Sequence, residues 1–140
     1  MNPLIEKAAQ YAAFVHGDQY RDDGKTPFIE HPRQVVKILM QVTTDENLIA
    51  AAWLHDTIED TPTTYADLLE HFGHDIACLV NEVTHEGKPD SRGFYFPRLK
   101  TQRGIMLKFA DRLSNISDMA DWDDSRRAHY LRKSKFWKSE

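Results

Sequence analysis

Apolar positions recur every three to four residues along most of the chain, the spacing of helices that pack one face on a core. The pair Asn2-Pro3 is an N-cap and first-turn signal, and behind it lies a face of Leu4, Ile5, Ala8, Ala9, Ala12 and Val15. A second face, interpreted as core, follows Pro32 and consists of Val35, Val36, Leu39 and Met40. The pattern predicts one helix from about residue 3 and another from Pro32.

The rest of the chain continues the helical period. A capping box of Thr43 and Glu46 predicts a helix that runs through AAWLHD and stops before Thr61-Pro62. Further helices are predicted from residue 63 or 64 to Gly73, at 75–84, 98–118 and about 124–137, while the glycines and prolines of 17–30 and 85–97 predict loops. Since no strand pattern is seen, we expect an all-α protein: a single compact bundle of six to seven helices, with residues 1–140 as one domain.

Composition and charge exclude several kinds of partner and location for this protein. A net charge of −4 argues against a nucleic-acid partner. No apolar run approaches the ~18 residues that cross a membrane, and MNPLIEKAAQ lacks the layout of a signal peptide. The single cysteine, Cys78, excludes an internal disulfide and suits a reducing compartment. We therefore expect a cytoplasmic protein without a membrane partner, with Cys78, in the apolar run IACLV, in the core.

The sequence WLHDTIEDTP contains an unusual group of ionisable residues directly behind an apolar run. In a continuous helix, His55, Asp56, Glu59 and Asp60 would share one edge, because residues three or four apart lie on the same face. Burying such groups without compensation costs several kcal/mol. A metal cation is the compensating group that suits a mixture of imidazole and carboxylates.

Two other segments offer the missing ligands. His31 stands where the first loop enters a helix, and Asp111 belongs to a polar stripe with Lys108, Asn115 and Asp118 in the long helix. The set His31, His55, Asp56 and Asp111 provides two nitrogen and two oxygen ligands, which suits Mn²⁺, Fe²⁺, Co²⁺ or Zn²⁺ with room for water. Glu59 and Asp60, one turn beyond, are the candidate catalytic residues that orient or deprotonate that water.

Each signal alone has a simpler interpretation. A His-Asp pair is common, Glu59 and Asp60 fit a solvated helix end, and Asp111-Arg112 fits a surface ion pair. The hypothesis depends on their conjunction on three helical segments. The other histidines are interpreted as surface residues or satisfied core residues: His16, His71, His74, His85 and His129.

The ordered pattern of His31, His55-Asp56 and Asp111 resembles the HD superfamily of metal-dependent phosphohydrolases. The stretches HGDQYRDDGKTPFIEHP, LHDTIEDT and KFADRLSNISDM, with the FG-then-VT segment of 72–84, are similar to the hydrolase domain of RelA/SpoT homologues. Among these, they look most like the small single-domain alarmone hydrolases. The resemblance covers about residues 5–120.

The resemblance implies hydrolysis of the 3′-pyrophosphate of guanosine tetra- or pentaphosphate, (p)ppGpp, with one Mn²⁺ per chain. It also implies that Arg21 stacks on the guanine and that Asn115 reaches the ribose. The predicted substrate-binding residues are Arg21, Lys25 and Asn115. The partner is then a small nucleotide. Which basic residue of 85–100 meets the phosphates stays open, as does the oligomeric state.

Three alternative functions remain compatible with the sequence. Two are nucleotide phosphohydrolases on the same scaffold, an NADPH 2′-phosphatase or a deoxynucleotide monophosphatase. The third is a non-catalytic nucleotide sensor, which the intact acidic pair Glu59 and Asp60 disfavours.

Overall fold

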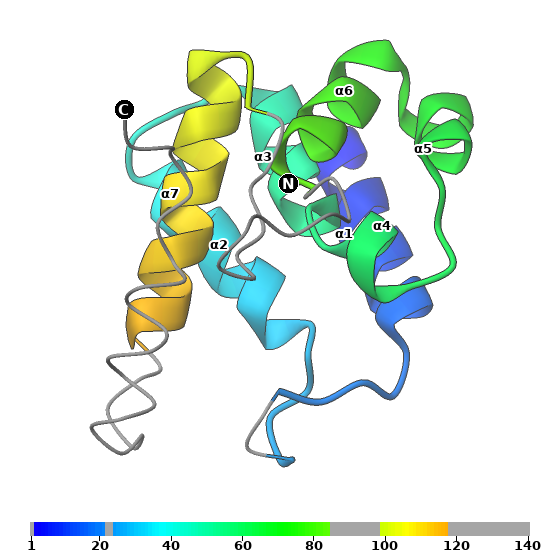
Figure 1. The fold of residues 1–140 in the computed structure, drawn as a ribbon, viewed down its shortest axis with the longest axis vertical. Coiled ribbons are helices and arrows are strands. Elements are labelled where there is room, and N and C mark those ends of the chain that lie inside the picture. The colour runs from blue at the N-terminus through cyan, green and yellow to red at the C-terminus, as the bar shows by residue number, and fades with distance from the viewer. Residues whose placement is uncertain (1, 22–23, 85–98, 118–140) are drawn as a thin grey trace, which may run out of the picture.

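The computed structural model describes residues 2–21, 24–84 and 99–117, and within these ranges every regular element is a helix (Figure 1). The helices are α1 (Pro3–His16), α2 (Glu30–Met40), α3 (Glu46–Leu54), α4 (Thr57–Asp60), α5 (Tyr65–Phe72), α6 (His74–Val83) and α7 (Gln102–Ser117). The all-α prediction is confirmed. The loop predicted at 85–97 and the helix predicted at about 124–137 lie outside the described residues.

The central helix is α3, whose residues from Leu48 to Leu54 are all buried. A helix that is apolar on every side is stable only when neighbours surround it. Here α1, α2 and α6 pack against it, and α7 packs across α2 and α6 (Figure 1). The end of α3 is therefore in the interior, where the ionisable residues of LHDTIED begin.

The predicted helix through AAWLHD is wrong as a single element, because α3 ends at Leu54 and α4 begins at Thr57. Asp56 stands between them with φ −101° and ψ 1°, the sparsely populated bridge region that is frequent in functional sites. The Thr57 hydroxyl donates to the Leu54 carbonyl at 2.7 Å and satisfies the end of α3. The break gives Asp56 an orientation of its own, separate from Glu59 and Asp60.

Other element ends also differ from the prediction. Asp45 caps α3, with its carboxylate accepting from the Leu48 N–H at 3.1 Å, so Thr43 is not the cap. Thr43 instead accepts from the Asp45 N–H and holds the cap in place. Helix α2 begins two residues before Pro32, and α7 begins at Gln102 rather than at residue 98.

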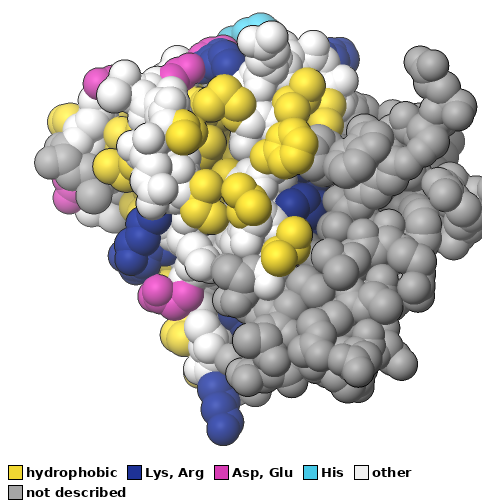
Figure 2. Space-filling view, turned by 90° about the vertical axis from the view of Figure 1, so that its left-hand side faces the viewer, with side chains coloured by type: hydrophobic (Ala, Val, Ile, Leu, Met, Phe, Trp, Pro, Cys, Tyr) yellow, Lys and Arg dark blue, Asp and Glu magenta, His cyan; other side chains and the backbone are white. Residues whose placement is uncertain are grey.

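Of the predicted polar stripe of α7, Lys108 and Asp111 are buried and Asn115 is partly exposed, whereas Asp118 lies outside the described residues. Ser114 is buried on the same inward side, and the exposed side of the helix carries Ile105, Phe109, Leu113 and Ile116. Figure 2 shows hydrophobic side chains gathered on this side of the molecule. Met40 at the end of α2 is exposed and Cys78 is partly exposed, so the prediction that both lie in the core is wrong. The inward polar face of α7 is explained by the site that it lines.

The connection between α1 and α2 folds back on itself. The Arg21 N–H donates to the Thr26 carbonyl at 2.8 Å and the Phe28 N–H to the Gln19 carbonyl at 2.9 Å, around an isolated bridge between Tyr20 and Pro27. This hairpin-like loop places Arg21 next to the bundle. Within the described ranges, no helix has both the length and the apolar character needed to span a membrane.

Candidate metal centre

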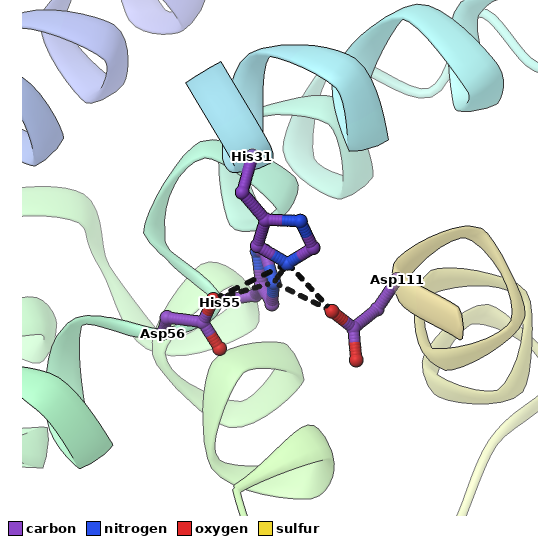
Figure 3. A group of neighbouring side chains, drawn as sticks. All are labelled: His31, His55, Asp56 and Asp111. Carbon is purple, nitrogen blue, oxygen red and sulfur yellow. Dashed lines mark hydrogen bonds and ion pairs between the residues drawn. The ribbon is translucent and has the colours of Figure 1, made fainter. Parts of the chain in front are cut away.

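Four ionisable side chains converge where α2, the α3–α4 junction and α7 meet (Figure 3). His31 comes from the first turn of α2, His55 and Asp56 from the junction, and Asp111 from the middle of α7. Each offers one ligand atom, and these atoms lie within 4.8 Å of one another. His31, His55 and Asp111 are buried and Asp56 is partly exposed, so the group opens to solvent on the Asp56 side.

The distances within the group suit a single small ion. The Nε2 atom of His31 lies 2.8 Å from Asp111 Oδ1 and 3.5 Å from Asp56 Oδ2. The Nε2 atom of His55 lies 3.0 Å from Asp56 Oδ2, 3.2 Å from Asp111 Oδ1 and 3.3 Å from the Nε2 atom of His31. Ligand atoms about 2.1 Å from one ion would be about 3.0–3.4 Å apart at octahedral or tetrahedral angles.

Each imidazole ring is oriented by a hydrogen bond to its Nδ1 atom, on the side that faces away from the carboxylates. The Nδ1 atom of His55 lies 2.7 Å from the Ala52 carbonyl, which can only accept, so Nδ1 carries the hydrogen. The Ser114 hydroxyl donates to Gln34 Oε1 at 2.8 Å and accepts from the Nδ1 atom of His31 at 3.0 Å. In the neutral rings both Nε2 lone pairs therefore face the carboxylate oxygens, an arrangement that a proton or a metal cation between them would stabilise.

The electrostatics also favour a positive charge at the centre. Burial is the largest single influence on the pKa of His55 and opposes its charged form. The Asp56 and Asp111 carboxylates together outweigh burial and raise the pKa of His55 well above its usual value. Burial likewise opposes the ionisation of Asp56, yet His55 and His31 lower the pKa of Asp56 to about 2. For Asp111, Lys108 and the two histidines outweigh burial and hold the pKa well below its usual range. A divalent cation satisfies the same demand as a bound proton.

The predicted catalytic pair lies beside this group but not within it. Glu59 and Asp60 are the last two residues of α4 and both are exposed. Although the side chain of Asp60 reaches solvent, the surrounding protein partly shields its carboxyl group from water, and this shielding, followed by the Asp56 and Glu59 carboxylates, raises the pKa of Asp60 to about 6. A carboxyl group of this kind changes charge close to neutral pH, whereas an ordinary aspartate does so near pH ~4.

Two of the three predicted substrate-binding residues are in contact. The Arg21 Nη2 atom donates to Asn115 Oδ1 at 3.1 Å and joins the first loop to α7 across 94 positions of sequence. Asn115 stands one turn beyond Asp111 on α7. Lys25 is exposed in the loop just after Gly24. Among the basic residues of 85–100, only Lys100 falls within the described ranges, and its backbone N–H donates to Glu82 at 3.0 Å.

Three residues around the centre were not assigned a role from the sequence. Ser114 and Gln34 orient His31, and Lys108 lies 3.5 Å from Asp111 Oδ2 while donating to the Val83 carbonyl. A local signal exists for each, because Gln34 follows His31 by three positions, Ser114 follows Asp111 by three and Lys108 precedes Asp111 by three. Polar residues on the same helical face as a ligand are candidates for its hydrogen-bond partners.

Comparisons with known proteins agree with this geometry. The family model described as HD domain matches residues 8–90. Guanosine-3′,5′-bis(diphosphate) 3′-pyrophosphohydrolase MESH1 of Xenopus tropicalis is 36% identical over 150 residues, which covers 98% of this chain and 82% of the relative. The enzyme of the same description from Aquifex aeolicus is 37% identical over 131 residues, and there the chain spans only 19% of the relative's length.

A solved structure supports the same relationship. It is described as a metazoan ortholog of SpoT that hydrolyzes ppGpp, and it superimposes with a TM-score of 0.82 at 32% sequence identity. The match covers 96% of this chain and 83% of that one.

Proposed function

The chain belongs to the HD domain family, and from this premise we propose that it hydrolyses the 3′-pyrophosphate of guanosine tetra- and pentaphosphate, (p)ppGpp, to GDP or GTP and pyrophosphate. The observation that carries the proposal is the convergence of two imidazole and two carboxylate ligands from three chain segments. The hydrogen bond between Arg21 and Asn115, one turn from Asp111, supports a nucleotide bound beside them.

The proposed ligands are His31, His55, Asp56 and Asp111, and the proposed ion is one Mn²⁺ per chain, with Fe²⁺, Co²⁺ or Zn²⁺ as substitutes. Imidazole and carboxylate ligands without thiolate suit these ions. A bound divalent cation would lower the pKa of a water molecule and polarise a phosphoryl oxygen of the substrate.

The chain's own contribution to the chemistry is to orient water and to accept its proton. We assign these roles to Glu59 and Asp60. The pKa of Asp60, raised to about 6, supports its role as the general base, because such a group is most effective when its pKa lies near the working pH. The ionised Asp60 takes a proton from the attacking water as the water oxygen bonds to the phosphorus attached to the 3′ oxygen. The bond between that phosphorus and the 3′ oxygen breaks, pyrophosphate leaves with the water oxygen, and the 3′ oxygen takes up a proton to become the hydroxyl of GDP or GTP.

The nucleotide is held by residues outside the metal group. In this proposal the Arg21 guanidinium lies over the face of guanine, where a planar cation is attracted to the ring. Asn115 binds the ribose and Lys25 meets a phosphate. A cytoplasmic location and the absence of nucleic-acid partners belong to the same proposal, supported by the single cysteine and the net charge of −4.

The decisive experiment is a product assay of the Mn²⁺-loaded protein with ppGpp, NADPH and deoxynucleoside monophosphates side by side. We expect GDP and pyrophosphate from ppGpp, with much slower turnover of the other two. The matched control is Asp60→Asn, which keeps the shape of the side chain and is expected to reduce kcat ~10²–10⁴-fold with the metal still bound. Turnover of NADPH or of a monophosphate in place of ppGpp would overturn the substrate assignment. Binding of ppGpp without turnover would indicate a sensor.

A further inference from the structure

His16, the last residue of α1, is a buried histidine that has no part in the chemistry described above. Its side chain is 2% exposed, so of the two interpretations given to it, a surface residue or a satisfied core residue, its position in the core holds. It is not fully satisfied, however, because its Nε2 atom is buried and has no hydrogen-bond partner among the described residues 2–21, 24–84 and 99–117. A buried unpaired polar atom costs about 1–3 kcal/mol, and a histidine kept in spite of that cost requires an explanation.

The other ring nitrogen of His16 is used. Its Nδ1 atom lies 3.1 Å from Gln19 Oε1. An amide oxygen can only accept, so Nδ1 carries the hydrogen and donates it. Burial lowers the pKa of His16, which keeps the ring neutral and in this tautomer. The ring is held in place by Phe28, at 4.6 Å between ring centroids.

Gln19 also contacts Asp60, the candidate general base. Its Nε2 atom donates to the Asp60 carbonyl oxygen at 2.8 Å. Both ends of the Gln19 amide are thus engaged, one by α1 and the other by the last residue of α4. The two helices also pack against each other (Figure 1).

Helix α4 needs such an external bond because it is very short. It has four residues, and its end is held by the Asp60 N–H to Asp56 carbonyl bond at 3.0 Å and the Thr61 N–H to Thr57 carbonyl bond at 3.1 Å. An isolated helical turn is unstable by itself. The position of the Asp60 carboxylate therefore depends on what fixes its backbone from outside.

We propose that His16 is a positioning residue that acts through Gln19 to hold Asp60 in place for catalysis. The relay runs from the Nδ1–H of His16 to Gln19 Oε1, and from Gln19 Nε2 to the Asp60 carbonyl. Only the Nδ1 side of the imidazole takes part. The inference rests on the proposed function for its catalytic readout, but the relay itself is testable without substrate.

Three variants test which of the two ring nitrogens of His16 takes part in the relay. His16→Asn places an amide donor near the position of Nδ1 and lacks any counterpart of Nε2. His16→Phe keeps the ring volume and removes both nitrogens, and Gln19→Met removes the second member of the relay. Gln10→Met, on the exposed side of α1, is the matched control for Gln19→Met.

The first measurement is hydrogen exchange of the Asp60 and Thr61 amides, which needs neither metal nor substrate. We expect exchange on the order of tenfold faster in His16→Phe and Gln19→Met, as the loss of one hydrogen bond would produce. Amides of α6 should be unchanged, and His16→Asn and Gln10→Met should match the wild type. Unchanged exchange in His16→Phe, or equal acceleration in His16→Asn, would overturn the relay.

The second measurement is steady-state hydrolysis of ppGpp. His16→Phe and Gln19→Met should each lower kcat about 10- to 100-fold, since small displacements of a catalytic group have effects of this size, with KM changed much less. In an Asp60→Asn background His16→Phe should have no further effect on kcat, because the relay acts through that residue. A full additional loss in the double variant would show that His16 acts elsewhere.

Failure of the relay is distinguishable from failure of the proposed function. A wild-type protein that does not hydrolyse ppGpp refutes the function, while hydrogen exchange still decides whether His16 and Gln19 hold Asp60. Conversely, active wild-type enzyme with unchanged kcat in His16→Phe refutes the relay and leaves the function standing.

Discussion

At the scale of single residues, the orientation of the His31 ring depends on one hydroxyl group. Ser114 is fully buried on α7 and accepts from the Nδ1 atom of His31 while donating to Gln34. It thereby selects the tautomer whose Nε2 lone pair faces Asp56 and Asp111. Partners of this kind contribute about 10- to 100-fold to metal affinity.

Ser114→Ala is therefore expected to weaken Mn²⁺ binding about 10- to 100-fold, with the fold intact, because the ring loses the hydrogen bond that sets its tautomer. Calorimetric titration of the metal-free protein near neutral pH measures the change. Thr44→Ala, at an exposed position before α3, is the control. Equal affinity in the wild type and Ser114→Ala would mean that packing alone orients His31.

Arg21 allows a separate test of substrate recognition. Arg21→Ala should raise KM for ppGpp roughly five- to thirty-fold with kcat changed much less, because the proposed stacking on guanine would contribute about equally to the ground state and the transition state. Steady-state kinetics measures this split, and Arg33→Ala, in which the partly exposed pair with Glu30 is lost, is the control. A fall in kcat at constant KM would place Arg21 near the reacting phosphate.

At the scale of elements, the start of α7 is held by a buried carboxylate of α6. Glu82 accepts from the N–H groups of Lys100 and Thr101, both at 3.0 Å, and Thr101 in turn accepts from the Gly104 N–H. Gly104 faces Glu82 so closely that a Cβ atom there would overlap the carboxylate oxygen Oε2. This contact sets where α7 begins and hence where Asp111 lies along it.

Gly104→Ala should lower the free energy of unfolding by about 1–3 kcal/mol, the usual effect of overpacking. In an unconstrained helix the same substitution would stabilise by about 0.5–1 kcal/mol, so the sign is informative. Urea denaturation measures it. In a Glu82→Ala background the added methyl group should no longer destabilise. A more stable Gly104→Ala protein would show that Glu82 moves aside freely.

Arg103 joins α7 to two other helices. Its guanidinium contacts Asp45, the cap of α3, and Asp75 in the first turn of α6, each at 2.8 Å. Hydrogen bonding to Arg103 is the main reason that the pKa values of Asp45 and Asp75 are lowered. A carboxyl group whose pKa is lower in the folded than in the unfolded state stabilises the fold at pH values above its unfolded pKa. That contribution is lost as the pH falls through its folded pKa.

Arg103→Met should therefore destabilise the protein by about 1 kcal/mol at neutral pH, since the network is partly exposed. The difference from the wild type should shrink toward zero in acid as both carboxylates become protonated. Urea denaturation at several pH values tests this, with Arg33→Met as the control. A difference that persists in strong acid would assign the effect to packing of the arginine stem.

At the scale of the whole molecule, the proposed metal site joins segments that carry the fold. His31 belongs to α2, Asp111 to α7, and His55 with Asp56 follows the central helix α3. Without a cation, Asp56 and Asp111 remain close to each other beside two imidazoles. An ion that binds only the folded chain stabilises it in proportion to its affinity and concentration.

Removal of the metal by a chelator should accordingly lower the Tm, and restoring free Mn²⁺ to ~1,000 times its Kd should add about 4 kcal/mol of stability. Thermal unfolding with and without the ion measures this. His55→Ala is the control, because loss of one ligand should abolish the response to added Mn²⁺. A wild-type Tm that is the same in both conditions would contradict a site at this position.

The amino-acid sequence determined three things by itself. Its period of three to four apolar residues specified helices, and its dense polar window behind AAWL marked the end of α3 as a place for chemistry. The pattern also provided His31, His55, Asp56 and Asp111 as a set, which the structure brings within 4.8 Å; their role as ligands stays a prediction. The first two signals are local, because helix formation and the cost of burying charge act on neighbouring residues.

The tertiary structure decided what periodicity leaves open. A helical period shows which residues share a face but not which face turns inward, so the exposed apolar side of α7 and its buried stripe could not be read from spacing. The break at Asp56, where α3 ends at Leu54 and α4 begins at Thr57, likewise could not be read from the spacing of apolar residues. Contacts such as His31 with Asp111, 80 positions apart, and Gln19 with Asp60, 41 apart, exist only once the helices have packed.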